Sequence, residues 1–158
     1  MEKRFLHRFE VTAPLIKVAE FHQDSLALKK LTPFPLFIQL NNQEPLDEGS
    51  IADFTMWLGP LPVRWVARHK DVDPLCGFTD VQIQGPFCYW EHRHKFEQVD
   101  PQTSEIIDEI RAALGRGPLE KLVSYFMWIG LPVLFAYRSW ATRRWIQRRT
   151  RGNESPPS

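Results

Sequence analysis

The chain has 158 residues, of which 43% are hydrophobic and 13% aromatic, and its net charge is +1. This length and composition exclude general disorder and fit one compact domain that can bury a hydrophobic core. The sequence has only two cysteines, Cys76 and Cys88, and no recognisable signal peptide. We therefore expect a cytoplasmic protein with reduced thiols, because a secreted protein of this size would carry a framework of disulfides.

The first elements are marked by alternating apolar residues and by prolines. Alternation over residues 5–11 predicts a strand. Pro14 suits the first turn of a helix over residues 14–22, because a proline lacks the N–H that would have no partner there. A second short helix is predicted after Asp24, which is a favourable N-cap, and Pro33 ends it.

The middle of the chain predicts a run of strands separated by turn residues. These strands cover residues 36–41, 51–58, 63–71, 77–84 and 87–99. The next segment, residues 103–114, has the composition of a helix and an acceptable N-cap at Thr103 or Ser104.

A long helix is predicted from Pro118 onward, with an interruption at residues 130–132 where Gly and Pro occur. Residues 122–137 form an uncharged run, LVSYFMWIGLPVLFAY. As a helix this run would span roughly 24 Å, which is shorter than the hydrocarbon core of a bilayer. We expect it to be a core helix, and contact with a membrane is the alternative.

The C-terminal end is strongly basic. Residues 138–158 contain six Arg and a single acidic residue, Glu154. One interpretation is a solvated helix end whose cations complement the helix dipole. The other is weak contact with an anionic membrane through Arg143, Arg144, Arg148 and Arg149.

The most informative segment is residues 78–96, FTDVQIQGPFCYWEHRHKF, which reads as two strands joined at Gly85 and Pro86. Side chains alternate between the two faces of a strand, so one face is charged and the other is aromatic with embedded polar groups. The second face carries Phe78, Asp80 and Gln82 from the first strand, and Trp90, His92, His94 and Phe96 from the second. A mixed face of this kind is typical of a cavity wall.

The same segment carries a resemblance. The pattern F-x-D-x-Q-x-x-G-P-F-x-x-W-x-H-x-H-x-F, together with Leu134–Arg138 downstream, resembles the SRPBCC superfamily, and in particular its polyketide cyclase/dehydrase-like branch. That superfamily includes START domains and Bet v 1-like proteins, and the resemblance covers roughly residues 4–148.

The resemblance implies an α+β helix-grip fold. A curved antiparallel sheet of about seven strands would wrap around the long C-terminal helix, in the order β-α-α-β(6)-α. Residues 103–114 would form the last strand, with Ile106, Asp108, Ile110 and Ala112 on one face. Residues 4–149 would be a single ligand-binding domain, and residues 150–158 a disordered tail.

The resemblance also implies an internal pocket for a small hydrophobic molecule, such as a lipid, a quinone or a polyketide. The expected ligand-binding residues are Trp65, His69, Phe78, Asp80, Gln82, Trp90, His92, His94 and Phe96. His7 is also expected on the concave side of the sheet. Aromatic walls would supply affinity, and the few polar groups would orient the ligand.

Two alternatives remain open. An enzyme of the cyclase/dehydrase or isomerase kind would use His92, His94 or Asp80 as acid or base. A membrane-associated lipid carrier would use the basic C-terminal helix. We expect no metal and no cofactor, because H-x-H alone is a weak metal signal and no phosphate-binding loop is present. Nucleic acid is not expected either, since the aromatic residues lie on inward faces.

Overall fold

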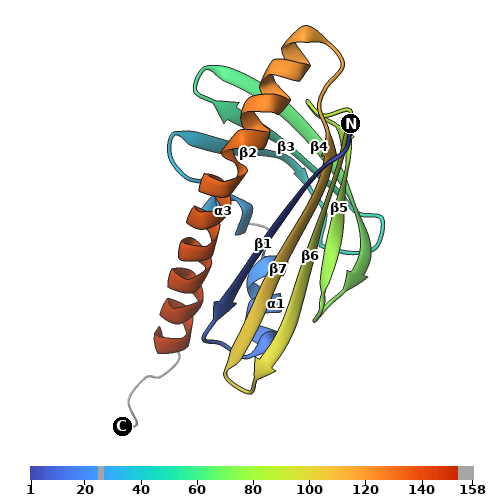
Figure 1. Ribbon diagram of the computed structural model, residues 1–158. Helices are drawn as coiled ribbons and strands as arrows, with labels where there is room; N and C mark the ends of the chain where they lie inside the picture. The colour runs from blue at the N-terminus through green and yellow to red at the C-terminus, as the bar shows by residue number, and fades with distance from the viewer. Residues whose placement is uncertain (25–26, 153–158) are drawn as a thin grey trace.

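The computed structural model describes residues 1–24 and 27–152, and they form one sheet and three helices (Figure 1). The strands are β1 (Lys3–Val11), β2 (Leu36–Gln43), β3 (Ile51–Leu58), β4 (Leu61–Asp73), β5 (Gly77–Gln84), β6 (Tyr89–Asp100) and β7 (Thr103–Ala113). The helices are α1 (Leu15–Gln23), α2 (Ala27–Lys30) and α3 (Pro118–Gly152). The predicted element order is confirmed.

The seven strands form a single antiparallel sheet in the order β1-β7-β6-β5-β4-β3-β2. Strands β2 to β7 follow one another as a meander, and β1 pairs with β7 at the far edge. The sheet curves, and α3 runs along its open side (Figure 1). This arrangement leaves the inner face of the sheet turned toward α3, with α1 and α2 at one end.

In the segment 103–114, the residues Thr103–Ala113 form strand β7, although they include several good helix formers. The segment lies between β1 and β6 and pairs with both along its length. Ile106, Ile107 and Ile110 are each about 1% exposed. Two complete ladders of hydrogen bonds and this burial outweigh the small intrinsic preference of Glu and Ala for helix.

Helix α3 continues without a break from Pro118 to Gly152, so the predicted interruption at residues 130–132 is wrong. Pro132 cannot donate a backbone hydrogen bond within the helix. Its neighbours Leu131 and Phe135 are buried against the sheet, and this packing holds both halves in one helix. The predicted tail boundary at residue 150 lies inside the helix, and residues 153–158 lie outside the described part of the chain.

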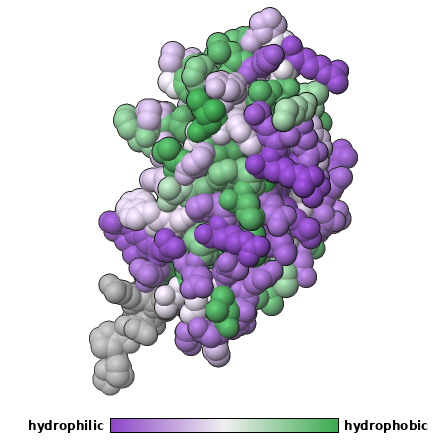
Figure 2. Space-filling view, in the orientation of Figure 1, coloured by the Kyte–Doolittle hydropathy of each residue, from purple (hydrophilic) through white to green (hydrophobic). Residues whose placement is uncertain are grey.

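The expectation of a core helix holds for only one face of α3. In its most apolar window only 22% of the residues are buried. An outer stripe of large apolar residues, each between 47% and 74% exposed, consists of Leu119, Leu122, Tyr125, Phe126, Ile129 and Val133. Figure 2 shows hydrophobic surface over the N-terminal half of α3 and more hydrophilic surface toward its C-terminal half. The apolar run of residues 122–137 therefore supplies both the buried face and the exposed face of α3.

Candidate functional site

A cavity of about 940 Å³ lies between the concave face of the sheet and α3. Its apolar wall includes Leu28, Leu36, Phe54, Met56, Trp65 and Leu131. Its polar wall includes His22, His69, Asp80, His92, His94 and Arg138. The volume lies within the range of small-molecule sites in proteins, and the division into a long apolar part and one polar part is typical of such sites.

The structure brings seven of the nine expected ligand-binding residues to this cavity. They are Trp65, His69, Phe78, Asp80, Trp90, His92 and His94. The aromatic part is closely packed, since the ring centroids of Trp65 and Trp90 are 5.3 Å apart in an edge-to-face arrangement. Phe87 adds a third ring, 4.7 Å from Trp90.

The other expected residues lie outside the cavity wall. Gln82 uses its side-chain amide to donate a hydrogen bond of 2.7 Å to the carbonyl of Phe87, so it orders the turn between β5 and β6. Phe96 packs in the core near α1, with its ring centroid 4.7 Å from that of His22. His7 does face α3, but it contacts Ser139, at 2.6 Å between Nε2 and Oγ. Alternation along a strand gave the correct face for these residues but could not give the extent of the cavity.

The polar wall is built by the register of four neighbouring strands. His69 of β4 lies opposite Asp80 of β5, and Asp80 lies opposite His92 of β6. His94 of β6 lies opposite Asp108 of β7. Directly opposed residues in an antiparallel pair have adjacent side chains, so imidazoles and carboxylates alternate across the sheet.

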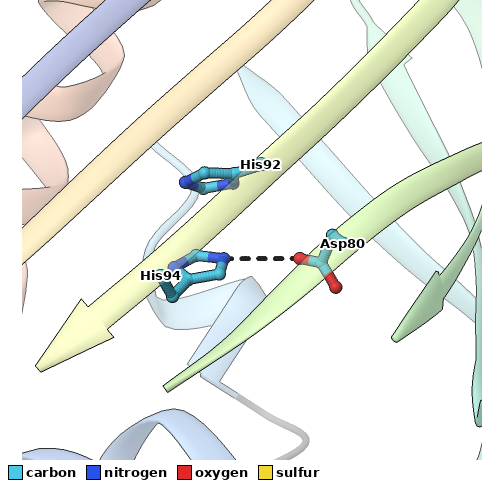
Figure 3. A group of neighbouring side chains, drawn as sticks. All are labelled: Asp80, His92 and His94. Carbon is cyan, nitrogen blue, oxygen red and sulfur yellow. Dashed lines mark hydrogen bonds and ion pairs between the residues drawn. The ribbon is translucent and has the colours of Figure 1, made fainter. Parts of the chain in front are cut away.

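These side chains form a continuous series of polar contacts. His92 Nε2 donates a hydrogen bond of 2.9 Å to Asp108 Oδ1, and His94 Nδ1 lies 3.0 Å from the same oxygen. His94 Nε2 donates to Asp80 Oδ2 at 3.3 Å (Figure 3). The other Asp80 oxygen is 3.2 Å from His69 Nε2. The Nδ1 atom of His69 is 2.8 Å from Ser50 Oγ, which ends the series.

The two adjacent histidines have opposite electrostatic environments. Burial lowers the pKa of His94, but the hydrogen bonds and charges of Asp108 and Asp80 outweigh burial and raise it to about 9. Burial, together with the positive charge of His94, lowers the pKa of His92 to about 4 despite its hydrogen bond to Asp108. Their ring centroids are only 3.8 Å apart. At neutral pH the site therefore holds one imidazolium beside one neutral imidazole.

Both carboxylates stay ionised. Burial alone would raise the pKa of Asp80, but its contacts with His69 and His94 lower it well below its usual range. Burial would likewise raise the pKa of Asp108, and its contacts with His92 and His94 lower it. A buried carboxylate without such partners would take up a proton, so the histidines keep both negative charges in the wall.

Sequence reasoning missed two residues of the polar wall, His22 and Arg138, and one residue behind it, Asp108. Asp108 was placed on the inward face of its strand, but only the register of β6 and β7 shows that it contacts two histidines. His22 comes from α1, and its Nδ1 donates a hydrogen bond of 2.8 Å to the carbonyl of Val18. Arg138 was assigned to the basic helix end, whereas the structure places it at the cavity. Helical spacing from Leu131 and Phe135 was the available signal for Arg138, because positions i, i+4 and i+7 share one face.

A divalent ion would have a candidate set of ligands here. Asp80, His92 and His94 each offer one ligand atom, and these atoms lie within 4.8 Å of one another. In the structure His92 Nε2 and both nitrogens of His94 already contact carboxylate oxygens. A metal would have to replace these contacts, so the arrangement as it stands suits the holding and transfer of protons.

Solved structures share this architecture. The aromatase/cyclase Zhui from Streptomyces sp. R1128 aligns with a TM-score of 0.79 at 14% identity, over 99% of this chain and 100% of that one. Norcoclaurine synthase from Thalictrum flavum aligns with a TM-score of 0.66 at 16% identity, over 94% of this chain and 88% of that one. A START superfamily protein from Mycobacterium smegmatis gives 0.63 at 12% identity, over 92% and 97%.

The chain has the helix-grip fold of the SRPBCC superfamily. The fold expected from the segment 78–96 is thereby confirmed. No family model matches the sequence, and no curated protein matches it either. At such low identities the SRPBCC likeness concerns the fold, and function must be argued from the cavity itself.

The histidine pair predicts a characteristic dependence of stability on pH. The pKa of His94 is raised from 6.5 to about 9, so its stabilising contribution is complete below pH 6.5 and is lost as the pH rises to 9. We expect the free energy of unfolding to fall over this window by up to about 1.4 kcal/mol per pH unit. The measurement is urea denaturation at a series of pH values.

Variants at two histidines separate the pH ranges in which His94 and His22 affect the stability. His94→Gln should remove the decline between pH 6.5 and 9. His22→Gln should leave that decline intact and instead alter the acid side, because burial lowers the pKa of His22 to about 4. If wild type and His94→Gln show the same dependence of stability on pH above pH 6.5, the conclusion that His94 is charged in the cavity wall is contradicted.

Proposed function

We propose that this protein binds a small hydrophobic molecule in the cavity between the sheet and α3. The observation that carries the proposal is the cavity of about 940 Å³, with an aromatic wall at one part and a paired polar cluster at another. A ligand would gain affinity by burying apolar area against Phe54, Trp65 and Trp90. Similar structures support it, since one is an aromatase/cyclase and another is norcoclaurine synthase in complex with dopamine and hydroxybenzaldehyde.

Trp90→Ala tests the aromatic wall. Trp90 is 8% exposed and contacts both Trp65 and Phe87, so truncation should cost about 3–5 kcal/mol of stability. We expect the variant to bind the neutral fluorophore Nile red at least tenfold more weakly than wild type. Tyr89→Ala is the matched control, because Tyr89 is the preceding residue and lies on the exposed face of the same strand. Nile red binding that survives in Trp90→Ala, or that is absent in wild type, would contradict the proposal.

Acid–base catalysis in the same cavity is a second candidate function. It is favoured by the separation of two pKa values, about 9 for His94 and about 4 for His92, in rings 3.8 Å apart. His94 would give up its 3.3 Å contact with Asp80 and donate the proton on Nε2 to a carbonyl oxygen of the ligand. The free Nδ1 of His92 would accept the proton from the neighbouring carbon, which gives an enol and leaves all atoms accounted for.

Deuterium exchange tests this second function without knowledge of the natural ligand. In D₂O the protein should accelerate exchange at the carbon next to the carbonyl of α-tetralone, a small aromatic ketone, as followed by NMR. His92→Gln and His94→Gln should lose this acceleration while binding the ketone with affinity similar to that of wild type. No acceleration by wild type at saturating ketone would reject the catalytic function and leave the binding function standing.

The outer face of α3 supports a further element of the proposed function, which is weak contact with an anionic membrane. Within the outer stripe, the exposed residues Leu122, Phe126, Ile129 and Val133 recur at steps of four, three and four and therefore share one face of α3. A contiguous exposed apolar face of this kind marks an interaction surface. Phe126 also lines the cavity, so the stripe borders the site where a lipid would enter.

The charge of α3 supports an anionic membrane as the occupant. Arg143, Arg144 and Arg148 are exposed and continue along α3 beyond the stripe. Each such cation near an anionic surface contributes about 1 kcal/mol. The side chain of Arg149, the fourth residue expected to take part, lies outside the described side chains.

Cosedimentation with lipid vesicles tests this contact. We expect binding to vesicles of phosphatidylglycerol and phosphatidylcholine at low salt, no binding to phosphatidylcholine alone, and a decline with rising salt. Ile129→Ser combined with Val133→Ser should abolish it, and Leu75→Ser, at an exposed apolar residue outside α3, should not. Absence of binding, or a dimer in sedimentation velocity that this double variant abolishes, would assign the stripe to something other than a membrane.

A further inference from the structure

Arg138 is a cation in the wall of the cavity without an anionic partner. Its Nε atom is buried and makes no hydrogen bond. No carboxylate within the described part of the chain approaches its guanidinium to ion-pair distance. Its guanidinium stacks on an aromatic ring, since Cζ lies 5.1 Å from the centroid of Phe135.

The position of Arg138 on α3 explains why it faces inward. Leu131 and Phe135 are buried against the sheet, and Arg138 follows them at seven and three residues. The cations further along behave differently. Arg143 is exposed and donates a hydrogen bond of 2.9 Å to the carbonyl of Glu10, and Arg144 is exposed and stacks on Trp140. Arg138 is therefore set apart from the basic helix end with which the sequence grouped it.

The nearby carboxylates are already occupied. Asp108 contacts His92 and His94, and Asp80 contacts His94 and His69. Burial lowers the pKa of Arg138, opposed by the more distant charges of Asp108 and Asp80. A guanidinium has five N–H donors and remains charged in proteins, so an interior position without an anion is unfavourable.

Arg138 also lies at the polar end of the cavity and not at a separate site. Burial lowers the pKa of His22, and the positive charges of both His94 and Arg138 lower it further. The geometry agrees, since the ring centroids of His22 and His94 are 6.4 Å apart, and the Phe135 ring lies 5.1 Å from Arg138 Cζ and 5.5 Å from the His92 ring. A ligand group placed at this end would meet Arg138 on the helix side and the His94 imidazolium on the sheet side.

We infer that the ligand carries an anionic oxygen group, of which a carboxylate fits best, and that Arg138 binds this group while the apolar body of the ligand lies against Phe54, Trp65 and Trp90. The inference rests on the proposed binding function and narrows its ligand class to amphipathic acids. The planar fork of a guanidinium matches the two oxygens of a carboxylate, and such charge-assisted pairs are stronger than neutral hydrogen bonds. The ligand would thereby give the guanidinium a direct anionic partner, which the described carboxylates do not provide because they contact the histidines.

A matched pair of probes tests the inference. The fluorescent acid 11-(dansylamino)undecanoic acid and its methyl ester have the same apolar body and differ only in the charged group. We expect wild type to bind the acid about 10- to 100-fold more tightly than the ester, as the loss of a hydrogen bond between charged groups would cost. Arg138→Met should bind both with the affinity that wild type has for the ester. Arg144→Met, on the exposed side of the same helix, should behave as wild type.

A second measurement does not depend on any ligand. Replacing a partly buried cation that has no direct ion pair with the described carboxylates by an apolar side chain of similar length should stabilise the ligand-free protein, so Arg138→Met should melt at a higher temperature than wild type. A lower melting temperature would show that Arg138 stabilises the fold, and it would overturn the inference. Equal affinity of wild type for acid and ester, or a preference that persists in Arg138→Met, would also overturn it. If neither probe binds wild type, the proposed binding function fails with it.

Discussion

A carboxylate inside a protein stays ionised only if cationic or hydrogen-bonding partners surround it, and the site of this protein depends on that constraint. Asp80 and Asp108 lie on β5 and β7, and β6 between them carries His92 and His94. The antiparallel register places each imidazole beside a carboxylate, so that neither acid is left alone. A shift of one residue in β6 would turn both histidines to the outer face and leave two buried charges without partners.

The charged residues on the sheet side and on the helix side of the cavity have different partners. On the sheet side of the cavity, the carboxylates and the histidines contact one another directly. On the helix side, no carboxylate of the described residues lies within ion-pair distance of Arg138. This asymmetry gives the cavity a direction, with a polar end that holds Arg138 and an aromatic part formed by residues such as Trp65 and Trp90. An internal ligand would therefore be oriented as well as buried, which is what either a carrier of amphipathic acids or an acid–base catalyst requires.

The alternation of side chains was sufficient to place most of the sheet and much of the site. Strand β6 could be read correctly because each of its faces has a single character, charged on one side and aromatic with histidines on the other. The same reasoning failed for Gln82 and Phe96, which share the inward face but lie where the turn and α1 fill the space. Periodicity gives the face of a strand, and the volume left beside that face depends on elements distant in sequence.

Apart from β7, whose composition favours a helix, the sequence by itself determined the strands, their inward faces, the long final helix and the aromatic character of a cavity, because these follow from local periodicity and composition. Only the tertiary structure decided which polar residues meet. Asp108 joins the histidines through the register of β6 and β7, and Arg138 turns into the cavity because α3 packs with Leu131 and Phe135 inward. It likewise decided that the outer stripe of α3 stays exposed, since a helix that is apolar on several sides has no local signal for the side that the sheet will cover.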